Sequence, residues 1–249
     1  MLREYKIQPE HWTGWISPYI CLLISNDKHK VLVDTGADGL SPTTGKLLQN
    51  LQAEGISPRD IDTVILTHGH PDHIGGNTTS EGKLTFPNAR FVMWKGEWDF
   101  WTSEQAELKL DENTRKLLLP LARKNLLPIQ GGLTLIDHET EIMPGIRAIA
   151  APGHTPGHMA LAISSKSDQM LVTSDAFLHP IHVEHPDWFA AIDSIPQQVI
   201  TTRRRLLNLI TEKTMVSSFH FPFPGLGHII RKGEGGSGNR LWQPIEKVG

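Results

Sequence analysis

Short apolar runs alternate along the chain with longer segments in which apolar residues recur at helical spacing. Runs that are apolar at every position are typical of strands buried on both faces, and they predict strands at 31–33, 63–66, 146–150, 170–173 and 215–218. Helical spacing predicts helices within 42–55, 96–127 and 196–211, the second of which is interrupted by Pro120. This alternation predicts an α/β fold.

Each of the five predicted strands leads directly into an aspartate or a histidine. These residues are Asp34, His68 and His70, His154, Asp175, and His220. Open α/β sheets bind their ligands at the carboxyl ends of the strands. The pattern therefore predicts one polar site at one rim of a packed sheet.

Composition sets limits on the class of protein. The chain has 249 residues, 39% of them hydrophobic and 20% charged, and its formal net charge is −3. This length can bury a sizeable core. We expect one domain spanning 1–249, with a helical insertion at about 95–128. The slightly acidic balance offers no basic surface for a nucleic acid, so we expect no nucleic-acid partner.

The single cysteine and the first residues bear on the compartment. Cys21 has no second cysteine with which to form a disulfide bond. The start of the chain lacks the apolar stretch of a signal peptide, and the longest early apolar run is 20–24. We therefore expect a cytoplasmic protein without a membrane partner. The Gly-rich segment 233–238 is typical of a flexible turn or loop.

The strongest chemical signal is the sequence His-Gly-His-Pro-Asp-His at 68–73. On an extended segment His68 and His70 point the same way and can chelate one ion, whereas Asp72 and His73 follow a proline-induced turn and can face a second ion. Imidazole and carboxylate ligands suit zinc, iron, manganese or cobalt. A solvated histidine-rich loop is the alternative interpretation.

This string resembles the signature of the metallo-β-lactamase superfamily, and later segments agree with that resemblance. They are Asp-Thr-Gly at 34–36, Gly-His-Thr-Pro-Gly-His at 153–158, Ser-Asp-Ala at 174–176 and Ser-Phe-His at 218–220. The resemblance extends from about Leu22 to His228. It implies the α/β four-layer αβ/βα sandwich of the metallo-β-lactamase fold.

The resemblance also implies a pair of divalent transition-metal ions, with zinc expected and iron, manganese or cobalt as alternatives. The implied ligands are His68, His70 and His154 for one ion, Asp72, His73 and His220 for the other, and Asp175 as the bridge. Three ligands and a bridge leave each ion an open position, as in catalytic sites. A bridging hydroxide would then cleave an ester, lactone or phosphotriester. Asp72 is the candidate catalytic residue that carries a proton to the leaving group.

Residues outside this set receive supporting roles. The resemblance implies that Asp34 positions the 68–73 loop, and His158 is expected to be structural. For His179 and His182 a place in the pocket wall and a solvated loop remain alternatives. Aromatic residues near the expected site favour a hydrophobic substrate if they line the pocket, and core packing is their alternative role. They are Trp94, Trp98, Phe100, Trp101, Phe177, Trp188, Phe221 and Phe223.

Within the superfamily the segment 217–228 resembles the methyl parathion hydrolase type of arylester and phosphotriester hydrolase, and quorum-quenching lactonases are the neighbouring branch. Homoserine lactonases typically carry a tyrosine after the bridging aspartate, but the only tyrosines here are Tyr5 and Tyr19. Alternatives are a thioesterase similar to glyoxalase II and a metal- or ligand-binding sensor without catalysis. We expect a small hydrophobic ester or lactone as the substrate, and a homodimer remains open.

Overall fold

The computed structural model describes residues 17–104, 112–232 and 239–245, and it contains two β-sheets. The first sheet has the strand order β1-β2-β3-β4-β5, and the second has the order β12-β11-β10-β9-β8-β7-β6. The first sheet consists of β1 (Leu22–Ser25), β2 (Lys30–Val33), β3 (Thr63–Leu66), β4 (Arg90–Trp94) and β5 (Leu133–Ile136). The second consists of β6 (Glu141–Met143), β7 (Ile146–Ala150), β8 (Met159–Ser165), β9 (Asp168–Val172), β10 (Met215–Ser217), β11 (Leu226–Lys232) and β12 (Asn239–Pro244).

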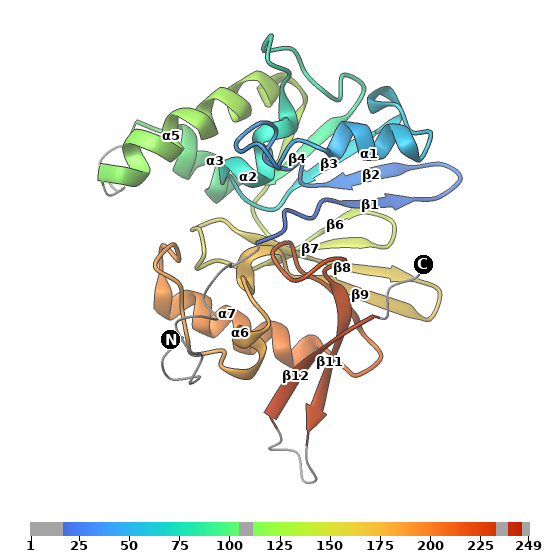
Figure 1. Ribbon diagram of the computed structural model, residues 1–249, viewed down its shortest axis with the longest axis vertical. Coiled ribbons are helices and arrows are strands. Elements are labelled where there is room, and N and C mark those ends of the chain that lie inside the picture. The colour runs from blue at the N-terminus through green and yellow to red at the C-terminus, as the bar shows by residue number, and fades with distance from the viewer. Residues whose placement is uncertain (1–16, 105–111, 233–238, 246–249) are drawn as a thin grey trace.

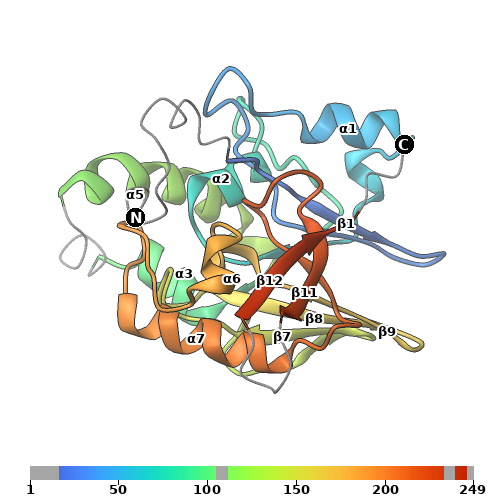
Figure 2. The ribbon, with the colours of Figure 1, turned by 60° about the horizontal axis from the view of Figure 1, so that its bottom comes forward.

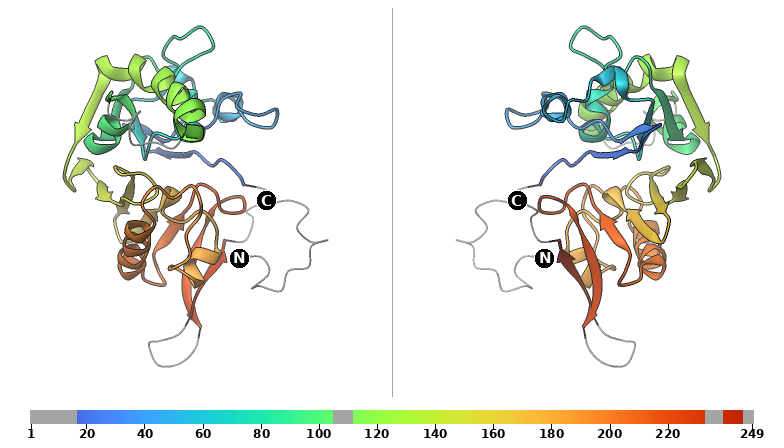
Figure 3. Two further views of the ribbon diagram at one scale, coloured as in Figure 1. Left: turned by 90° about the vertical axis from the view of Figure 1, so that its left-hand side faces the viewer. Right: turned by 90° about the vertical axis from the view of Figure 1, so that its right-hand side faces the viewer.

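Helices cover the outer face of each sheet (Figure 1). The first sheet carries α1 (Leu47–Ala53), α2 (Pro71–Ile74), α3 (Lys95–Thr102) and α5 (Glu112–Leu126), together with the short 3-10 turns η2 (Pro58–Asp60), η3 (Gly75–Asn77) and η4 (Leu127–Gly132). The second sheet carries η5 (Ser174–Ala176), α6 (Ile181–Glu184) and α7 (Pro196–Leu209). Figures 2 and 3 show the same two halves from other sides. In Figures 1 and 3, β11 and β12 extend beyond the neighbouring strands.

Alternation along the central strands creates three apolar layers. In β3, Val64 and Leu66 pack under the helices of the first half, while Ile65 points into the layer between the sheets. In β9, Leu171 packs toward α7 and Val172 toward the layer between the sheets. Because side chains of a strand alternate between the faces of its sheet, a strand buried on both faces must be apolar throughout. This explains the uninterrupted apolar runs of the sequence.

The fold class predicted from the sequence is confirmed, with helix, sheet, sheet and helix layers. The five predicted strands correspond to β2, β3, β7, β9 and β10, but they belong to two sheets and not to one. The polar site therefore lies where two sheets meet. The stretch expected to be a helical insertion holds α3 and α5, and residues 105–111 within it lie outside the described residues, as do Tyr5 and the loop expected at 233–238.

In the three described segments of the chain, no helix combines the length and the apolar character that crossing a membrane requires.

Candidate metal centre

The segment after β3 turns from an extended strand into a short helix. His68 and His70 lie before helix α2, which begins with Pro71, and Asp72 and His73 occupy its first turn. Proline favours the first position of a helix because its missing N–H is not needed there. The turn therefore separates His68 and His70 from Asp72 and His73.

The structure brings all seven predicted side chains together in two groups. Within each group the potential ligand atoms all lie within 4.8 Å of one another. The first group is His68, His70, His154 and Asp175, and the second is Asp72, His73 and His220. His179 and His182 belong to neither group.

The Asp175 carboxylate lies between the two groups. Its Oδ2 atom is 3.2 Å from Nε2 of His154 in the first group and 3.1 Å from Nε2 of His220 in the second. Its Oδ1 atom is 3.2 Å from Nε2 of His73. One carboxylate thus contacts imidazoles of both groups, as a bridging ligand must.

The donor set fits divalent metal ions better than a self-contained hydrogen-bond network. Nδ1 of His70 is 3.0 Å from Nε2 of both His68 and His154, so three imidazole nitrogens converge. Among the described residues, Nε2 of His73 and Oδ1 of Asp175 are buried and lie 3.2 Å apart, yet neither atom makes a hydrogen bond. Buried polar atoms are rarely left unpaired. A cation that accepts nitrogen and oxygen ligands, as zinc does, would satisfy them.

The far ring nitrogen of three of these histidines is held by a hydrogen bond from outside the groups. Such contacts fix the orientation and tautomer of a ligating imidazole. The pairs are His73 Nδ1 with Asp34 Oδ2 at 2.8 Å, His154 Nδ1 with Asp193 Oδ1 at 2.9 Å, and His220 Nδ1 with Ser17 Oγ at 2.8 Å.

Asp34 and His158 occupy the supporting positions expected of them. The Asp34 carboxylate accepts hydrogen bonds from the Thr67 N–H and the Thr67 hydroxyl, both at 2.8 Å, in addition to its contact with His73. His158 lies 3.0 Å from the carbonyl oxygen of Ala151 through Nδ1, and its Nε2 accepts from the N–H of Asp175 at 3.2 Å. Both residues therefore hold ligand-bearing segments in place.

Asp193 and Arg203 were missed by the sequence analysis. Besides its contact with His154, Asp193 lies 3.3 Å from Arg203 through its second oxygen, and both side chains are fully buried. Arg203 also donates to the carbonyl oxygens of Ala176 and Trp188. A lone aspartate in a loop and one of three consecutive arginines in a helix give no sequence signal for this arrangement.

Burial and neighbouring charges shift the pKa values in the centre in opposite directions. Burial and the adjacent His73 hold the pKa of His68 well below its usual value. For His154, burial is outweighed by hydrogen bonds with Asp175 and Asp193, which raise its pKa to about 9. Burial is likewise outweighed at Asp175, whose pKa His220 and His73 hold well below its usual range. The surrounding imidazoles thus favour an ionised Asp175 in the middle of the centre.

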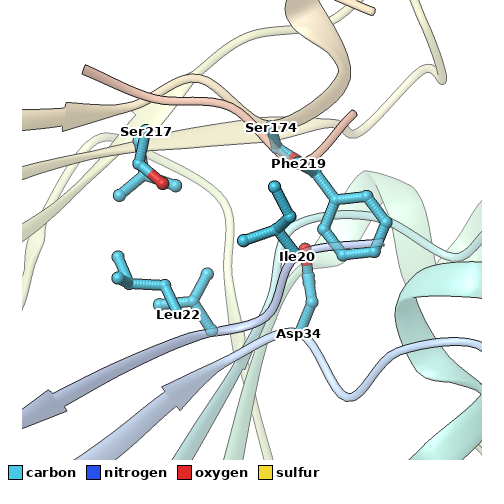
Figure 4. Close-up of a pocket in the computed structure, with 8 residues that line it drawn as sticks. Ile20, Leu22, Asp34, Ser174, Ser217 and Phe219 are labelled. Atoms are coloured by element: carbon cyan, nitrogen blue, oxygen red, sulfur yellow. The ribbon is translucent and has the colours of Figure 1, made fainter. Parts of the chain in front are cut away.

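A small cavity lies beside the centre, between the two sheets (Figure 4). It offers about 10 Å³ to the centre of a water molecule, roughly the space of one water and too little for a substrate. Its lining consists of Ile20, Leu22, Val33, Asp34, Val172, Ser174, Ser217 and Phe219. In Figure 4, Ile20 and Phe219 lie between Asp34 and Ser174.

None of the aromatic residues expected near the site lines this cavity. Trp101, Phe177 and Phe221 are buried in the apolar cores, whereas Phe223 is 72% exposed. Trp98 and Phe100 are partly buried against the core of the first half, and Trp94 is partly buried against the layer between the sheets. Core packing therefore accounts for six of the eight.

Tyr19 is an aromatic residue at the site that the sequence pattern did not indicate. Its ring lies edge-on against His220 with 5.5 Å between centroids. Partial burial raises the pKa of its hydroxyl, and the carboxylates of Asp72 and Asp175 raise it further. A neutral phenol thus stands beside the second group, although no tyrosine follows Asp175 in the sequence.

Comparisons with known proteins agree with this geometry. The model of the metallo-beta-lactamase superfamily matches residues 18–219. An N-acyl homoserine lactonase from Bacillus sp. is 27% identical over 239 residues, covering 88% of this chain and 84% of the relative.

Two solved structures share the architecture. AidC, a dizinc quorum-quenching lactonase in complex with an acyl homoserine product, aligns with a TM-score of 0.80 and 30% identity, covering 92% of this chain and 80% of AidC. The hydrolase AbOPH of the beta lactamase superfamily aligns with a TM-score of 0.87 and 25% identity, covering 100% of this chain and 86% of AbOPH. The chain belongs to the metallo-β-lactamase superfamily, and its similarity to N-acyl homoserine lactonases supports the lactonase branch.

Proposed function

We propose that the chain is a dinuclear-metal hydrolase that opens the ring of an N-acyl homoserine lactone. The observation that carries this proposal is the pair of adjacent ligand groups with the Asp175 carboxylate between them. The substrate class is supported by the similarity to lactonases, one of which is described with two zinc ions. Aryl esters and phosphotriesters have no comparable support.

We propose that the two ligand groups hold zinc ions with Asp175 shared between them. Two such ions would supply Lewis acidity and would lower the pKa of water toward neutrality, so that a hydroxide nucleophile would be available. The protein's own task is to aim the imidazole lone pairs inward. Asp34 and Asp193 do this for His73 and His154 by holding the opposite ring nitrogens.

Asp72 is our candidate for the proton carrier of the reaction. Its side chain is 19% exposed, whereas that of His220 beside it is 8% exposed and that of Asp175 is 2% exposed, so it faces the open side of the centre. Hydrolysis adds an oxygen to the lactone carbonyl carbon and breaks the ring C–O bond. The attacking water releases a proton, which the Asp72 carboxylate can accept and pass to the departing ring oxygen.

Apolar side chains flank the segments that carry the ligands. Tyr19, Phe189, Ile192 and Phe223 are all exposed to solvent. Ile192 precedes Asp193, which contacts His154, and Phe223 lies three residues after His220. Exposed apolar residues near a polar centre favour an uncharged substrate with an apolar chain. Tyr19 can additionally donate a hydrogen bond to a substrate oxygen.

The test is an activity panel on metal-loaded protein. It compares an N-acyl homoserine lactone, a δ-lactone, an aryl ester, an organophosphate triester and a glutathione thioester. We expect the highest kcat/KM for the homoserine lactone, its loss on chelation and its return when zinc is added. The highest kcat/KM on another substrate would overturn the substrate class, and turnover of none would support a sensor.

Variants connect the activity to the centre. Asp175→Ala should reduce turnover to background, because it removes the carboxylate common to both groups. His138→Ala is the matched control, since His138 is 76% exposed and lies in neither group. Full activity of Asp175→Ala would refute the proposed role of the paired groups.

A further inference from the structure

Helix α3 carries a fully buried carboxylate, Glu97, that the proposed reaction does not use. Both of its oxygens accept two hydrogen bonds. Oε1 accepts from the N–H of Gly69 at 2.8 Å and from the indole N–H of Trp101 at 2.6 Å. Oε2 accepts from the hydroxyl of Thr155 at 2.7 Å and from the N–H of Gly157 at 2.9 Å.

Three of these four donors belong to the two loops that supply the three histidines of the first ligand group. Gly69 separates His68 from His70, and Thr155 directly follows His154. The first loop belongs to the half of the molecule that contains β3, and the second joins β7 to β8 in the other half. One side chain therefore connects two loops whose ligands, His70 and His154, are 84 residues apart in the sequence.

Steric contacts show that α3 is fitted closely against both loops. A Cβ atom on Gly69 would lie 2.3 Å from the Trp101 ring, and one on Gly157 would lie 2.1 Å from the backbone nitrogen of Glu97. The Trp101 ring also stands edge-on to His70 at 5.5 Å. The two glycines of the motifs thus provide room for the helix that bears Glu97.

The contacts require a carboxylate and not merely a polar side chain of similar size. The N–H groups of Gly69, Gly157 and the Trp101 indole can donate but cannot accept. In one orientation a glutamine here would direct its NH₂ group toward the N–H groups of Gly69 and the Trp101 indole. In the other it would direct its NH₂ group toward the N–H of Gly157, with only the Thr155 hydroxyl able to accept. A buried donor facing another donor costs free energy and pushes the two groups apart.

From this geometry we propose that Glu97 is a positioning residue that holds the His70 and His154 loops at the separation needed for the first ion. The inference rests on the proposed metal centre. The second group, Asp72, His73 and His220, makes none of the four contacts. Loss of Glu97 should therefore weaken binding of one ion of the two.

The decisive experiment compares Glu97→Gln with Asp99→Asn in the full chain. Asp99 lies on the same helix but is exposed and paired with Lys95. Metal-free protein is titrated with Co²⁺, followed by visible absorption, and with Zn²⁺ in the presence of graded chelator. We expect Glu97→Gln to bind one ion about 10–100-fold more weakly, as is typical when a contact behind a metal ligand is lost. The second ion and Asp99→Asn should retain wild-type affinity.

Lactonase activity of Glu97→Gln should return at high Zn²⁺ concentration, which a merely misfolded variant would not show. Thr155→Val removes one donor to Glu97 and keeps the shape of the side chain, so it should weaken binding of the same ion by a smaller factor. If Glu97→Gln does not fold, the metal affinity of Thr155→Val tests the inference in its place. Wild-type affinity for both ions in a folded variant, or an equal loss of both, would overturn the inference. If wild-type protein binds two ions but opens no lactone, the proposed function fails while the role of Glu97 is still decided.

Discussion

Asp193 and Asp187 lie in the same loop, and each pairs with an arginine of helix α7, yet their surroundings differ. The Asp193–Arg203 pair is fully buried, with 3.3 Å between Oδ2 and Nη2. The Asp187–Arg204 pair is about 60% exposed, with 2.7 Å between its atoms. The Asp187–Arg204 pair has the shorter distance. We nevertheless expect it to contribute less to the stability of the fold, because water screens the attraction between exposed charges.

We expect Asp193→Asn to lower the free energy of unfolding by about 3–5 kcal/mol, because it leaves the buried Arg203 charge without its counter-charge. We expect Asp187→Asn to lower it by about 0.2–1 kcal/mol. Urea unfolding of the metal-free proteins measures both values.

The same pair of variants tests the contact with His154. Asp193→Asn should weaken binding of one ion about 10–100-fold, because the imidazole loses its fixed orientation, and Asp187→Asn should leave it unchanged. Equal stability and equal metal affinity of the two variants would show that Asp193 neither balances Arg203 nor orients His154.

At the scale of elements, the close packing of helix α3 explains why the two loops that contact it carry glycine at 69 and 157. The motif glycines at 69 and 157 face Trp101 and Glu97, so their identity reflects close packing and not backbone conformation. Neither glycine has a positive φ angle. Gly153 differs, because its φ is +135° and a Cβ there would also collide with Val199 of α7.

Gly157→Ala should therefore destabilise the protein although alanine suits the local backbone. The added Cβ forces α3 away from the loop, at a cost of about 1–3 kcal/mol for an overpacked site. Gly39→Ala is the control, because no atom lies within 4 Å of its added Cβ. Thermal melts of the two variants measure the difference, and an unchanged melting temperature for Gly157→Ala would contradict the close packing of α3.

The elements that the sequence predicted are those in which one physical rule dominates. Continuous apolar runs such as 63–66 had to be strands buried on both faces, and the structure has them so. The seven ligand candidates could be found because each follows a strand or lies in a short motif. The apolar runs did not predict that the strands divide between two sheets. An apolar run shows that a segment is a strand, but it does not show which other strand is hydrogen-bonded to it.

The supporting residues could not be predicted for a related reason. Glu97 lies in an amphipathic helix among other charged residues, and only the tertiary fold brings Gly69 and Gly157 to it. Tyr19 reaches His220 across about two hundred residues of sequence. Contacts of this kind depend on how distant segments meet, which local pattern does not encode.

At the scale of the whole molecule, each ligand group draws on both halves of the sandwich. His68 and His70 follow β3 of the first sheet, while His154 and Asp175 follow β7 and β9 of the second. In the second group, Asp72 and His73 come from the first half, and His220 follows β10. Bound ions would therefore join the two halves, and metal binding should be coupled to folding.

We expect removal of the metal ions by a chelator to lower the melting temperature of the whole molecule. An ion present at a thousand times its Kd stabilises the folded state by about 4 kcal/mol. For a chain of this size that corresponds to roughly 8–16 °C per ion. Differential scanning calorimetry with chelator, and then with added Zn²⁺, measures the shift.

Because the ions act on both halves, hydrogen exchange should increase on chelation at the loop after β3 and also at η5 and the loop after β10. Faster exchange in one half alone would show that the ions do not join the two sheets.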